Sequence, residues 1–462
     1  MENIKLILGD CLDKLKELPE DSVDSIVTDP PYGLSFMGKA WDHSVPSKEV
    51  WGECLRVLKP GGHLLSFSGT RTYHRMAVNI EDAGFEIRDQ LNWIYGSGFP
   101  KSLDVSKAID KVAGAEREII GKVAGMGKQN PEWNGTAQGR AENSFKPEYN
   151  KTKPTPPDAQ QWDGWGTALK PAHEPIVLAR KPLIGTVAQN VLEHGTGGIN
   201  IDGCRIGLDD DDRLKKGGSY SGNRSGSKVS SLFNAGNGKI EYSAPPGRYP
   251  ANLIHDGSEE VVGLFPNTKS GASAAGGHKR SHENMRKGSS VYGNGRGIAG
   301  TSSTDDAGSL YGDSGSASRF FKSCPYDHDD FRLMYYCGKA SKTDRDEGLE
   351  SFLEKEAGIK NDSGRGFSES DPMKKIMRRN NHPTVKPTEL MRYLVRLVTP
   401  LGGIVLDPFM GSGSTGKGAV LEGFSFIGIE LDSNYIEIAQ ARIEYAGELK
   451  RKENREKINT IF

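Results

Sequence analysis

The sequence lacks long hydrophobic runs, an excess of basic residues and closely spaced cysteines. No stretch approaches the roughly 18 consecutive apolar residues of a membrane-spanning helix, so we expect no membrane association. The N-terminal segment has neither a basic region nor a long apolar core, so it does not predict a signal peptide. The 60 Lys and Arg residues are balanced by 61 Asp and Glu residues, so any surface that binds nucleic acid must be local.

The five cysteines include no C-x-x-C pair, which argues against a disulfide framework or a clustered zinc site and favours a reducing cytoplasm. Cys324, His328 and Cys337 have a spacing that fits no standard zinc site. We therefore predict a cytoplasmic protein without a metal.

Both ends of the chain show alternating strand and helix patterns. The expected strands are 4–8, 23–28, 63–67, 85–95, 175–179, 404–406 and 426–429, and the expected helices are 11–18, 49–58, 71–83, 388–398, 415–422 and 434–446. Alternation of this kind predicts an α/β fold with a doubly wound sheet.

The middle of the chain is irregular. A hydrophobic content of 35% with 58 glycines indicates a packed core that carries long insertions. The predicted parts are 1–182, one half of the core with an insertion at about 99–165; 183–380, a second insertion; 381–450, the other half of the core; and 451–462, a charged tail that frays. Within the second insertion, the Gly/Ser-rich segment 266–318 is expected to be flexible.

The segment LDPFMGSGSTG lies between an expected strand and an expected helix. Its glycines allow close approach of a ligand to the backbone, and the helix start offers free N–H groups. Glu430 ends the next strand, where an acid can accept hydrogen bonds from ribose hydroxyls. The P-loop and G-x-G-x-x-G patterns are absent, so a ligand with ribose but no pyrophosphate, such as S-adenosylmethionine, fits better. The alternative is a tight turn that binds nothing.

The segment VDSIVTDPPYG places Asp29, Pro30, Pro31 and Tyr32 at the carboxyl end of a strand, where open α/β sheets bind ligands. The amino group of a heteroaromatic ring is a poor nucleophile because its lone pair is delocalised. Two acceptors in the ring plane, the Asp29 carboxylate and the Pro30 carbonyl, would favour a more pyramidal nitrogen, and the Tyr32 ring offers a stacking face. The alternative is an ordinary Pro-Pro turn with a capping Asp.

Together these motifs resemble the DNA amino-methyltransferases that modify N6 of adenine or N4 of cytosine. DPPY resembles the catalytic motif and DPFMGSGSTG the cofactor motif. HPTVKP, residues 382–387, resembles the segment beside the methionine end of the cofactor, and GDC at 9–11 the segment beside its adenine. The order of the motifs is similar to the β-class arrangement of bacterial and phage enzymes. That resemblance implies a Rossmann-like methyltransferase core, a mostly parallel sheet with one antiparallel strand, and a target-recognition insertion.

The resemblance also implies the site residues. The catalytic residues would be Asp29, Pro30, Pro31 and Tyr32. The residues that would bind S-adenosylmethionine are Asp10, Cys11, Thr384, Lys386, Asp407, Pro408, Phe409, Gly411, Gly413, Ser414, Thr415 and Glu430.

The implied activity is site-specific methylation of N6 of a flipped-out adenine in double-stranded DNA. Members that methylate N4 of cytosine more often carry Ser in place of Asp29, so Asp favours adenine. The motifs are also compatible with methylation of RNA or of a protein amide, and with DNA binding without catalysis. No Cys follows a Pro, which argues against carbon-5 chemistry. A homodimer and a cognate restriction enzyme remain open as partners.

Two further features have alternative interpretations. Lys374, Lys375, Arg378 and Arg379 precede HPTVKP and would either bind phosphates or form a solvated face. Trp162 and Trp165 would either contact DNA or, as we expect, have a packing role.

Overall fold

The computed structural model describes residues 4–34, 42–96, 102–124, 148–206, 247–269, 314–324, 340–361 and 373–461. The chain divides into two compact units. Unit 1 comprises Met1–Cys204, Asn252–Val261 and Ser323–Phe462, and unit 2 comprises Arg205–Ala251 and Val262–Lys322.

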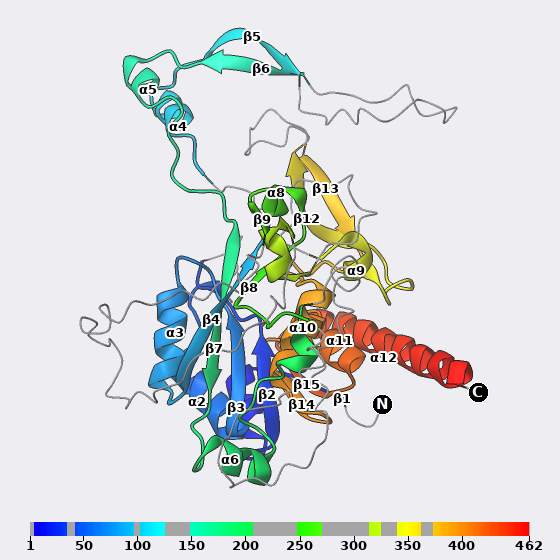
Figure 1. Ribbon diagram of the computed structural model, residues 1–462. Helices are drawn as coiled ribbons and strands as arrows, with labels where there is room; N and C mark the ends of the chain where they lie inside the picture. The colour runs from blue at the N-terminus through cyan, green and yellow to red at the C-terminus, as the bar shows by residue number, and fades with distance from the viewer. Residues whose placement is uncertain are drawn as a thin grey trace, which may run out of the picture. The chain divides into compact units, whose positions relative to one another are not determined.

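The main sheet has nine strands, in the order β1-β15-β14-β2-β3-β7-β4-β8-β11 (Figure 1). The strands are β1 (Ile4–Leu8), β15 (Ser425–Glu430), β14 (Ile404–Asp407), β2 (Val23–Thr28), β3 (Leu58–Phe67), β7 (His173–Arg180), β4 (Glu86–Ile94), β8 (Leu253–His255) and β11 (Lys322–Ser323). From β1 to β3 all neighbours are parallel, whereas β7 is antiparallel to both β3 and β4. The predicted α/β fold, with a mostly parallel sheet and one antiparallel strand, is confirmed.

Helices cover both faces of this sheet. One face packs against α10 (Thr388–Val398), α11 (Ser414–Glu422) and α12 (Ser433–Ile461), and the other against α1 (Cys11–Lys16), α2 (Lys48–Val57) and α3 (Tyr73–Asp82). Successive residues of a strand point to opposite faces, so Leu64 and Leu65 belong to different cores. The central strands are apolar on both faces, as buried parallel strands require.

The sheet brings the two ends of the chain together. β14, from the C-terminal part, lies beside β2, with Val405 opposite Ser25 and Leu406 opposite Ile26. β15 likewise lies beside β1. The segments that follow β2 and β14 therefore emerge at the same edge of the sheet, which is where α/β sheets bind ligands.

Two expected boundaries were wrong. β3 begins at Leu58 and not at residue 63, because the backbone N–H of Gly61 donates to the Lys181 carbonyl and the N–H of Lys181 donates to the Gly62 carbonyl. Residues 451–461 were expected as a separate tail, whereas α12 continues as a helix to Ile461. Charged residues such as Lys, Glu and Arg are good helix formers, so an exposed charged segment can extend a docked helix.

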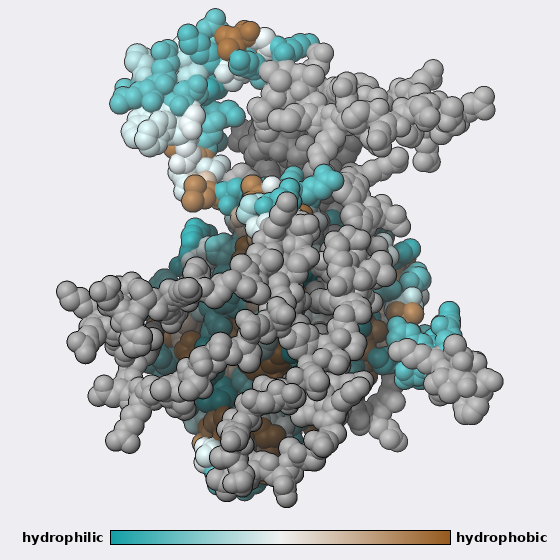
Figure 2. Space-filling model, in the orientation of Figure 1, coloured by the Kyte–Doolittle hydropathy of each residue, from teal (hydrophilic) through white to brown (hydrophobic). Residues whose placement is uncertain are grey.

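The insertion between β4 and β7 contains α4 (Val105–Val112), β5 (Glu118–Ala124), β6 (Glu148–Lys153) and α5 (Pro157–Gln161), and β5 and β6 form an antiparallel hairpin. Figure 2 shows a mostly hydrophilic surface over these elements, with scattered apolar residues. Trp162 is 39% exposed and Trp165 is 61% exposed, and their rings contact each other edge to face. The two rings thus pack against each other, as an exposed pair and not within a core.

The remaining elements lie after β7. They are α6 (Val187–His194), η3 (Asp202–Cys204), α8 (Glu259–Val262), α9 (Lys342–Asp346), and the hairpin of β12 (Lys355–Asn361) and β13 (Met373–Arg378). Of the four basic residues that precede HPTVKP, Lys374, Lys375 and Arg378 lie on β13. No helix among the described residues has the length and apolar character needed to cross a lipid bilayer.

Unit 2 contains β9 (Asn267–Lys269), β10 (Ser314–Ser316) and the short helix η5 (Ala317–Phe320). β9 and β10 pair, so the two ends of the segment 266–318 are ordered, contrary to expectation, and residues 270–313 lie outside the described residues. The guanidinium groups of Arg248 and Arg319 lie over the ring of Phe320.

Candidate active site

The Asp-Pro-Pro-Tyr turn and the Gly-rich turn meet at the carboxyl ends of β2 and β14. Thr28, the last residue of β2, donates a hydrogen bond of 2.6 Å to Asp407, the last residue of β14. Asp29 and Gly411 line the same pocket, which encloses about 300 Å³ of empty space, part of it open to solvent. The fold therefore unites the two motifs in one site.

The pocket contains half of the predicted site residues. Of these, Asp29, Thr384, Lys386, Asp407, Phe409, Gly411, Ser414 and Thr415 line it. Five further residues line the pocket without having been named as site residues: His382, Val385, Met391, Met410 and Ser412. All of them except Met391 lie within the two predicted cofactor motifs, HPTVKP and DPFMGSGSTG. The other predicted residues lie in the same motifs but are not part of this lining: Asp10, Cys11, Pro30, Pro31, Tyr32, Pro408, Gly413 and Glu430.

The Asp-Pro-Pro-Tyr turn is held by Asp42, a buried residue from the following loop. Its carboxylate accepts backbone N–H bonds from Tyr32 at 2.7 Å, Gly33 at 2.9 Å and Leu34 at 3.3 Å. Gly33 has a φ of 66°, a conformation that favours glycine. Three anchored amides and two fixed proline φ angles make this turn rigid before any ligand arrives.

Asp29 has a partner on each carboxylate oxygen. The Tyr32 hydroxyl lies 2.7 Å from Oδ1, and the Lys386 ammonium lies 2.5 Å from Oδ2. Burial and the carboxylates of Asp29 and Glu174 raise the pKa of Tyr32 well above its usual value. Burial lowers the pKa of Lys386, but the same carboxylates outweigh this effect and the pKa is raised. Tyr32 therefore stays protonated and Lys386 stays charged.

Lys386 was predicted as a cofactor residue, but its ammonium has partners on the catalytic side. Besides Asp29, it lies 3.3 Å from Glu174 and 3.2 Å from the Tyr32 hydroxyl. It also lies 5.5 Å from the centroid of the Tyr32 ring and 4.8 Å from that of Phe67. Lys386 also lines the pocket, so it contacts the catalytic turn and borders the space next to the Gly-rich turn.

Glu174 is the main site residue that the sequence analysis missed. It is the second residue of β7, and its Oε2 lies 3.0 Å from the Tyr32 hydroxyl. Because β7 is antiparallel to its neighbours, its first residues lie at the edge where the parallel strands end. The sequence did contain one signal for this residue, because Glu174 is a charged residue at the start of the strand that becomes the antiparallel β7.

Asp407 organises the Gly-rich turn. Its buried carboxylate accepts hydrogen bonds from the hydroxyls of Thr28 and Thr415 and from the backbone N–H of Phe409. Burial raises the pKa of Asp407 to about 6, although these hydrogen bonds oppose the shift.

The raised pKa of Asp407 predicts a pH-dependent stability. The folded protein binds this proton more tightly than the unfolded chain, whose carboxyl has a pKa of 3.8. The stabilisation by the protonated form is therefore complete below pH 3.8 and is lost as the pH rises to about 6. We expect Asp407→Asn to remove this dependence, so that the difference in unfolding free energy between wild type and variant changes by about 2–3 kcal/mol over that range. Urea titrations at pH 4, 5, 6 and 7 would measure it, and a constant difference would contradict the assignment.

Two glycines of the turn serve different purposes. Gly411 has a φ of 55° and lines the pocket, and a Cβ there would lie 2.9 Å from Nε2 of His382. Gly413 has a φ of 80°, and a Cβ there would lie 2.9 Å from that of Ala439 on α12. Gly413 thus permits close helix packing, whereas the Gly-rich pattern predicted ligand approach at both glycines.

Glu430 and the start of α1 lie side by side at the ends of β15 and β1. Glu430 accepts backbone N–H bonds from Gly411 at 2.7 Å and Asp432 at 2.8 Å. The Asp10 carboxylate caps α1, accepting from the N–H of Leu12 at 2.9 Å. Burial raises the pKa of the Cys11 thiol to about 12, so this thiol stays protonated. The backbone of Gly9 donates to the carbonyl of Glu430, which keeps the two segments together.

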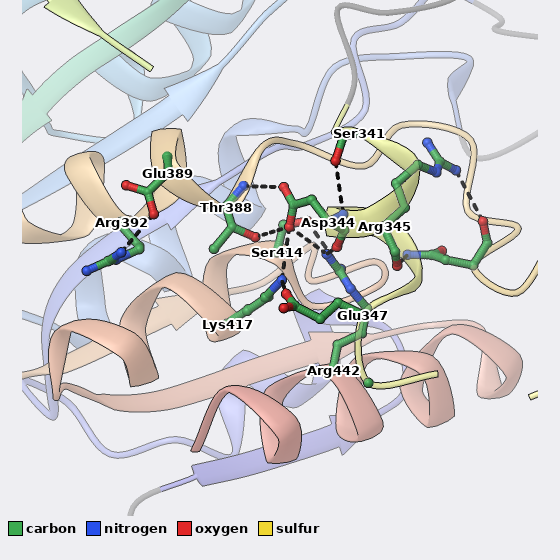
Figure 3. Close-up of polar contacts among 12 residues, drawn as sticks. Ser341, Asp344, Arg345, Glu347, Thr388, Glu389, Arg392, Ser414, Lys417 and Arg442 are labelled. Atoms are coloured by element: carbon green, nitrogen blue, oxygen red, sulfur yellow. Dashed lines mark hydrogen bonds and ion pairs between the residues drawn. The ribbon is translucent and has the colours of Figure 1, made fainter. Parts of the chain in front are cut away.

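A buried polar network supports the Gly-rich turn through contacts with Ser412 and Ser414 (Figure 3). The guanidinium of Arg442 on α12 donates to the Ser412 carbonyl at 2.6 Å and lies 3.4 Å from the Ser414 hydroxyl. Its other end donates to the Asp344 carbonyl at 3.1 Å. Lys417 on α11 pairs with Asp344 at 2.9 Å and Glu347 at 2.5 Å. Two pocket-lining serines are thereby fixed through α9, α11 and α12.

No group of three or more His, Cys, Asp or Glu side chains among the described residues is arranged to hold a metal ion. His328 and Cys337 lie outside the described residues.

Comparison with known proteins agrees with the motifs. Residues 23–441 match the sequence model of the N6/N4 DNA methylase family. The DNA adenine methyltransferase YhdJ of Escherichia coli is 42% identical over 73 residues, which are 16% of this chain and 25% of that protein. The type II methyltransferase M.HpaI of Haemophilus parainfluenzae is 32% identical over 116 residues, which are 23% of this chain and 37% of that protein. The alignments thus span about a quarter and just over a third of these two relatives.

Solved structures show weaker similarity. The complex of M1.HpyAVI with SAM covers 95% of this chain and 98% of that chain, with 14% identity and a TM-score of 0.34. The cytosine-N4-specific PvuII DNA methyltransferase covers 97% of this chain and 92% of that chain, with 12% identity and a TM-score of 0.37. These scores are too low to support a residue-by-residue comparison.

Proposed function

Because the chain belongs to the DNA methylase family, we propose that it is a site-specific methyltransferase that methylates N6 of adenine in double-stranded DNA. The observation that carries this proposal is that Asp29 and Gly411 line one pocket. One turn offers a carboxylate to an amino group and the other offers a glycine-lined wall to a methyl donor. We assign target recognition to residues 183–380.

The residues around the pocket fit S-adenosylmethionine. Gly411 leaves open the space that a Cβ would fill, and Phe409 and Met410 supply apolar contact surface. Thr384, Ser414 and Thr415 supply polar groups around it. Asp10 and Glu430 sit at the adjacent strand ends with oxygen lone pairs left for adenine and ribose groups. When bound, the donor supplies a methyl group on a positively charged sulfur.

The protein's own part in the reaction is to orient and activate the amino group. Asp29 accepts one N–H of the base amino group and the Pro30 carbonyl the other, which localises the nitrogen lone pair. The Asp42-anchored amides keep both acceptors in place, so they need no reorganisation when the base enters. The Tyr32 ring supports the flipped base by stacking. Adenine is favoured over cytosine N4 by the carboxylate at Asp29, since N4 enzymes more often have Ser there.

The direct test is to express the chain in a methylation-free host and to map modified bases by long-read sequencing. N6-methyladenine at a defined site would support the proposal, and N4-methylcytosine would favour the alternative base. Purified protein should also be offered DNA, RNA and protein acceptors with labelled S-adenosylmethionine. Label in RNA or protein alone, or DNA binding without incorporation, would contradict the proposal.

The pocket wall gives a second test. Gly411→Ala would place a methyl group 2.9 Å from the His382 ring and strain a backbone φ of 55°. We expect S-adenosylmethionine binding to weaken at least about tenfold, which corresponds to about 1.4 kcal/mol. Gly402→Ala is the matched control, because its φ is 72° but a Cβ there meets no atom within 4 Å. Calorimetry should show normal binding for Gly402→Ala, and equal binding by both variants would exclude Gly411 from the wall.

A further inference from the structure

Four side chains from three parts of the chain form one hydrogen-bonded cluster at the catalytic edge. They are Asp29 and Tyr32 after β2, Glu174 on β7, and Lys386 before α10. The Lys386 ammonium has three hydrogens, and it has three oxygen partners here: Asp29 at 2.5 Å, Tyr32 at 3.2 Å and Glu174 at 3.3 Å. The ammonium thus has one oxygen partner in the cluster for each of its three hydrogens.

The cluster carries an unbalanced charge. The side chains of Lys386, Asp29 and Glu174 are only 7%, 17% and 19% exposed. Two carboxylates and one ammonium leave one net negative charge in a poorly solvated place. Such a charge is costly unless a cation compensates it. Asp407, the other carboxylate of the pocket lining, already accepts three hydrogen bonds.

Without Glu174, Asp29 and Lys386 would form a neutral pair. With it, the lysine charge is shared between two carboxylates and the cluster as a whole attracts a cation. Tyr95, whose hydroxyl lies 3.5 Å from Oε1 of Glu174, restricts the other end of that carboxylate. Glu174 is therefore placed to set the charge of the site without itself lining the pocket.

We propose that Glu174 is a positioning residue that adds one negative charge to the catalytic side of the site, so that the site prefers the sulfonium form of the methyl donor to the uncharged thioether product. This inference rests on the proposed function. In the transfer the carbon–sulfur bond breaks with its electron pair going to sulfur, and the nitrogen lone pair forms the carbon–nitrogen bond. The positive charge passes to the amino nitrogen, which then loses one proton to water. The same negative charge stabilises the cation before and after its transfer.

The test compares binding of S-adenosylmethionine and S-adenosylhomocysteine by calorimetry, which requires no turnover. In Glu174→Gln we expect the preference for the sulfonium to fall about tenfold, because a unit charge is lost from a partly buried site. Glu174→Asp keeps the charge and should keep the preference. Glu86→Gln is the control, since Glu86 also pairs with a buried cation, Arg180 at 2.6 Å, but at the opposite end of the sheet.

Removing the charge of Lys386 should change the preference for the sulfonium in the opposite direction. Lys386→Gln leaves two carboxylates and should raise the preference for the sulfonium, and the double variant Glu174→Gln with Lys386→Gln should return it to the wild-type value. A purely structural role would weaken both ligands together in every variant, and that result would overturn the inference. Should Glu174→Gln not fold, Lys386→Gln and Glu174→Asp still decide the sign.

This design separates the inference from the proposed function. A wild-type protein that prefers the sulfonium but methylates no DNA would refute the proposed acceptor and leave the role of Glu174 standing. A wild-type protein that methylates DNA while Glu174→Gln keeps the full preference would do the reverse.

Discussion

Asp29→Ala is expected to reduce methyl incorporation into DNA about 1,000-fold or more, because the variant lacks the acceptor that prepares the amino nitrogen. The pocket wall formed by Phe409, Gly411 and Thr415 is untouched by the change. S-adenosylhomocysteine should therefore still bind. Steady-state rates of label transfer, with calorimetric binding of the product in parallel, would measure both effects.

The control for this experiment is Asp24, an aspartate within β2, the strand that precedes Asp29. Asp24 is buried, pairs with Lys59 at 2.6 Å and accepts the backbone N–H of Ile404 at 2.7 Å, but it lies at the other end of β2. Asp24→Asn should lower stability while leaving the rate per folded molecule unchanged. If folded Asp29→Ala keeps more than about a tenth of the wild-type rate, Asp29 is not the acceptor that the mechanism requires.

Asp344→Ala is expected to lower the free energy of unfolding by about 3–5 kcal/mol, because it removes the carboxylate that pairs with both buried cations, Lys417 and Arg442. Asp344 accepts from the Thr388 N–H at 2.8 Å and pairs with Lys417, whose side chain is 2% exposed. Burial raises the pKa of Asp344, but Lys417 and Arg442 outweigh it and lower the pKa, which is the mark of a favourable ion pair. Chemical denaturation followed by circular dichroism would measure the loss.

Glu389→Ala provides the comparison within the same region (Figure 3). Glu389 pairs with Arg392 at 2.7 Å, yet its side chain is 54% exposed, so its loss should change stability by less than about 1 kcal/mol. A similar loss in both variants would show that the Asp344 network adds nothing beyond a surface ion pair. Asp344→Ala should also weaken cofactor binding. Arg442, which pairs with Asp344, contacts Ser412 and Ser414, and both serines line the pocket.

Much of the candidate site could be predicted from the sequence because the two motifs are local. Prolines at 30 and 31, the glycines at 411 and 413 and the flanking apolar strands obey backbone rules that act over a few residues. The side chains that complete the site do not obey such rules. Asp42 anchors the catalytic turn, Asp344 anchors the cofactor turn, and neither belongs to a recognisable motif.

The amino-acid sequence by itself determined the strands, the two turns that end β2 and β14, and the family to which their motifs belong, since short-range sterics and apolar periodicity specify these features. Only the tertiary structure decided that Glu174 contacts Tyr32 and that the Lys386 ammonium contacts Asp29 and Glu174. The physical reason is that such contacts depend on which strands pair and in which direction. That choice is made by packing across the whole sheet, through residues far apart in the chain.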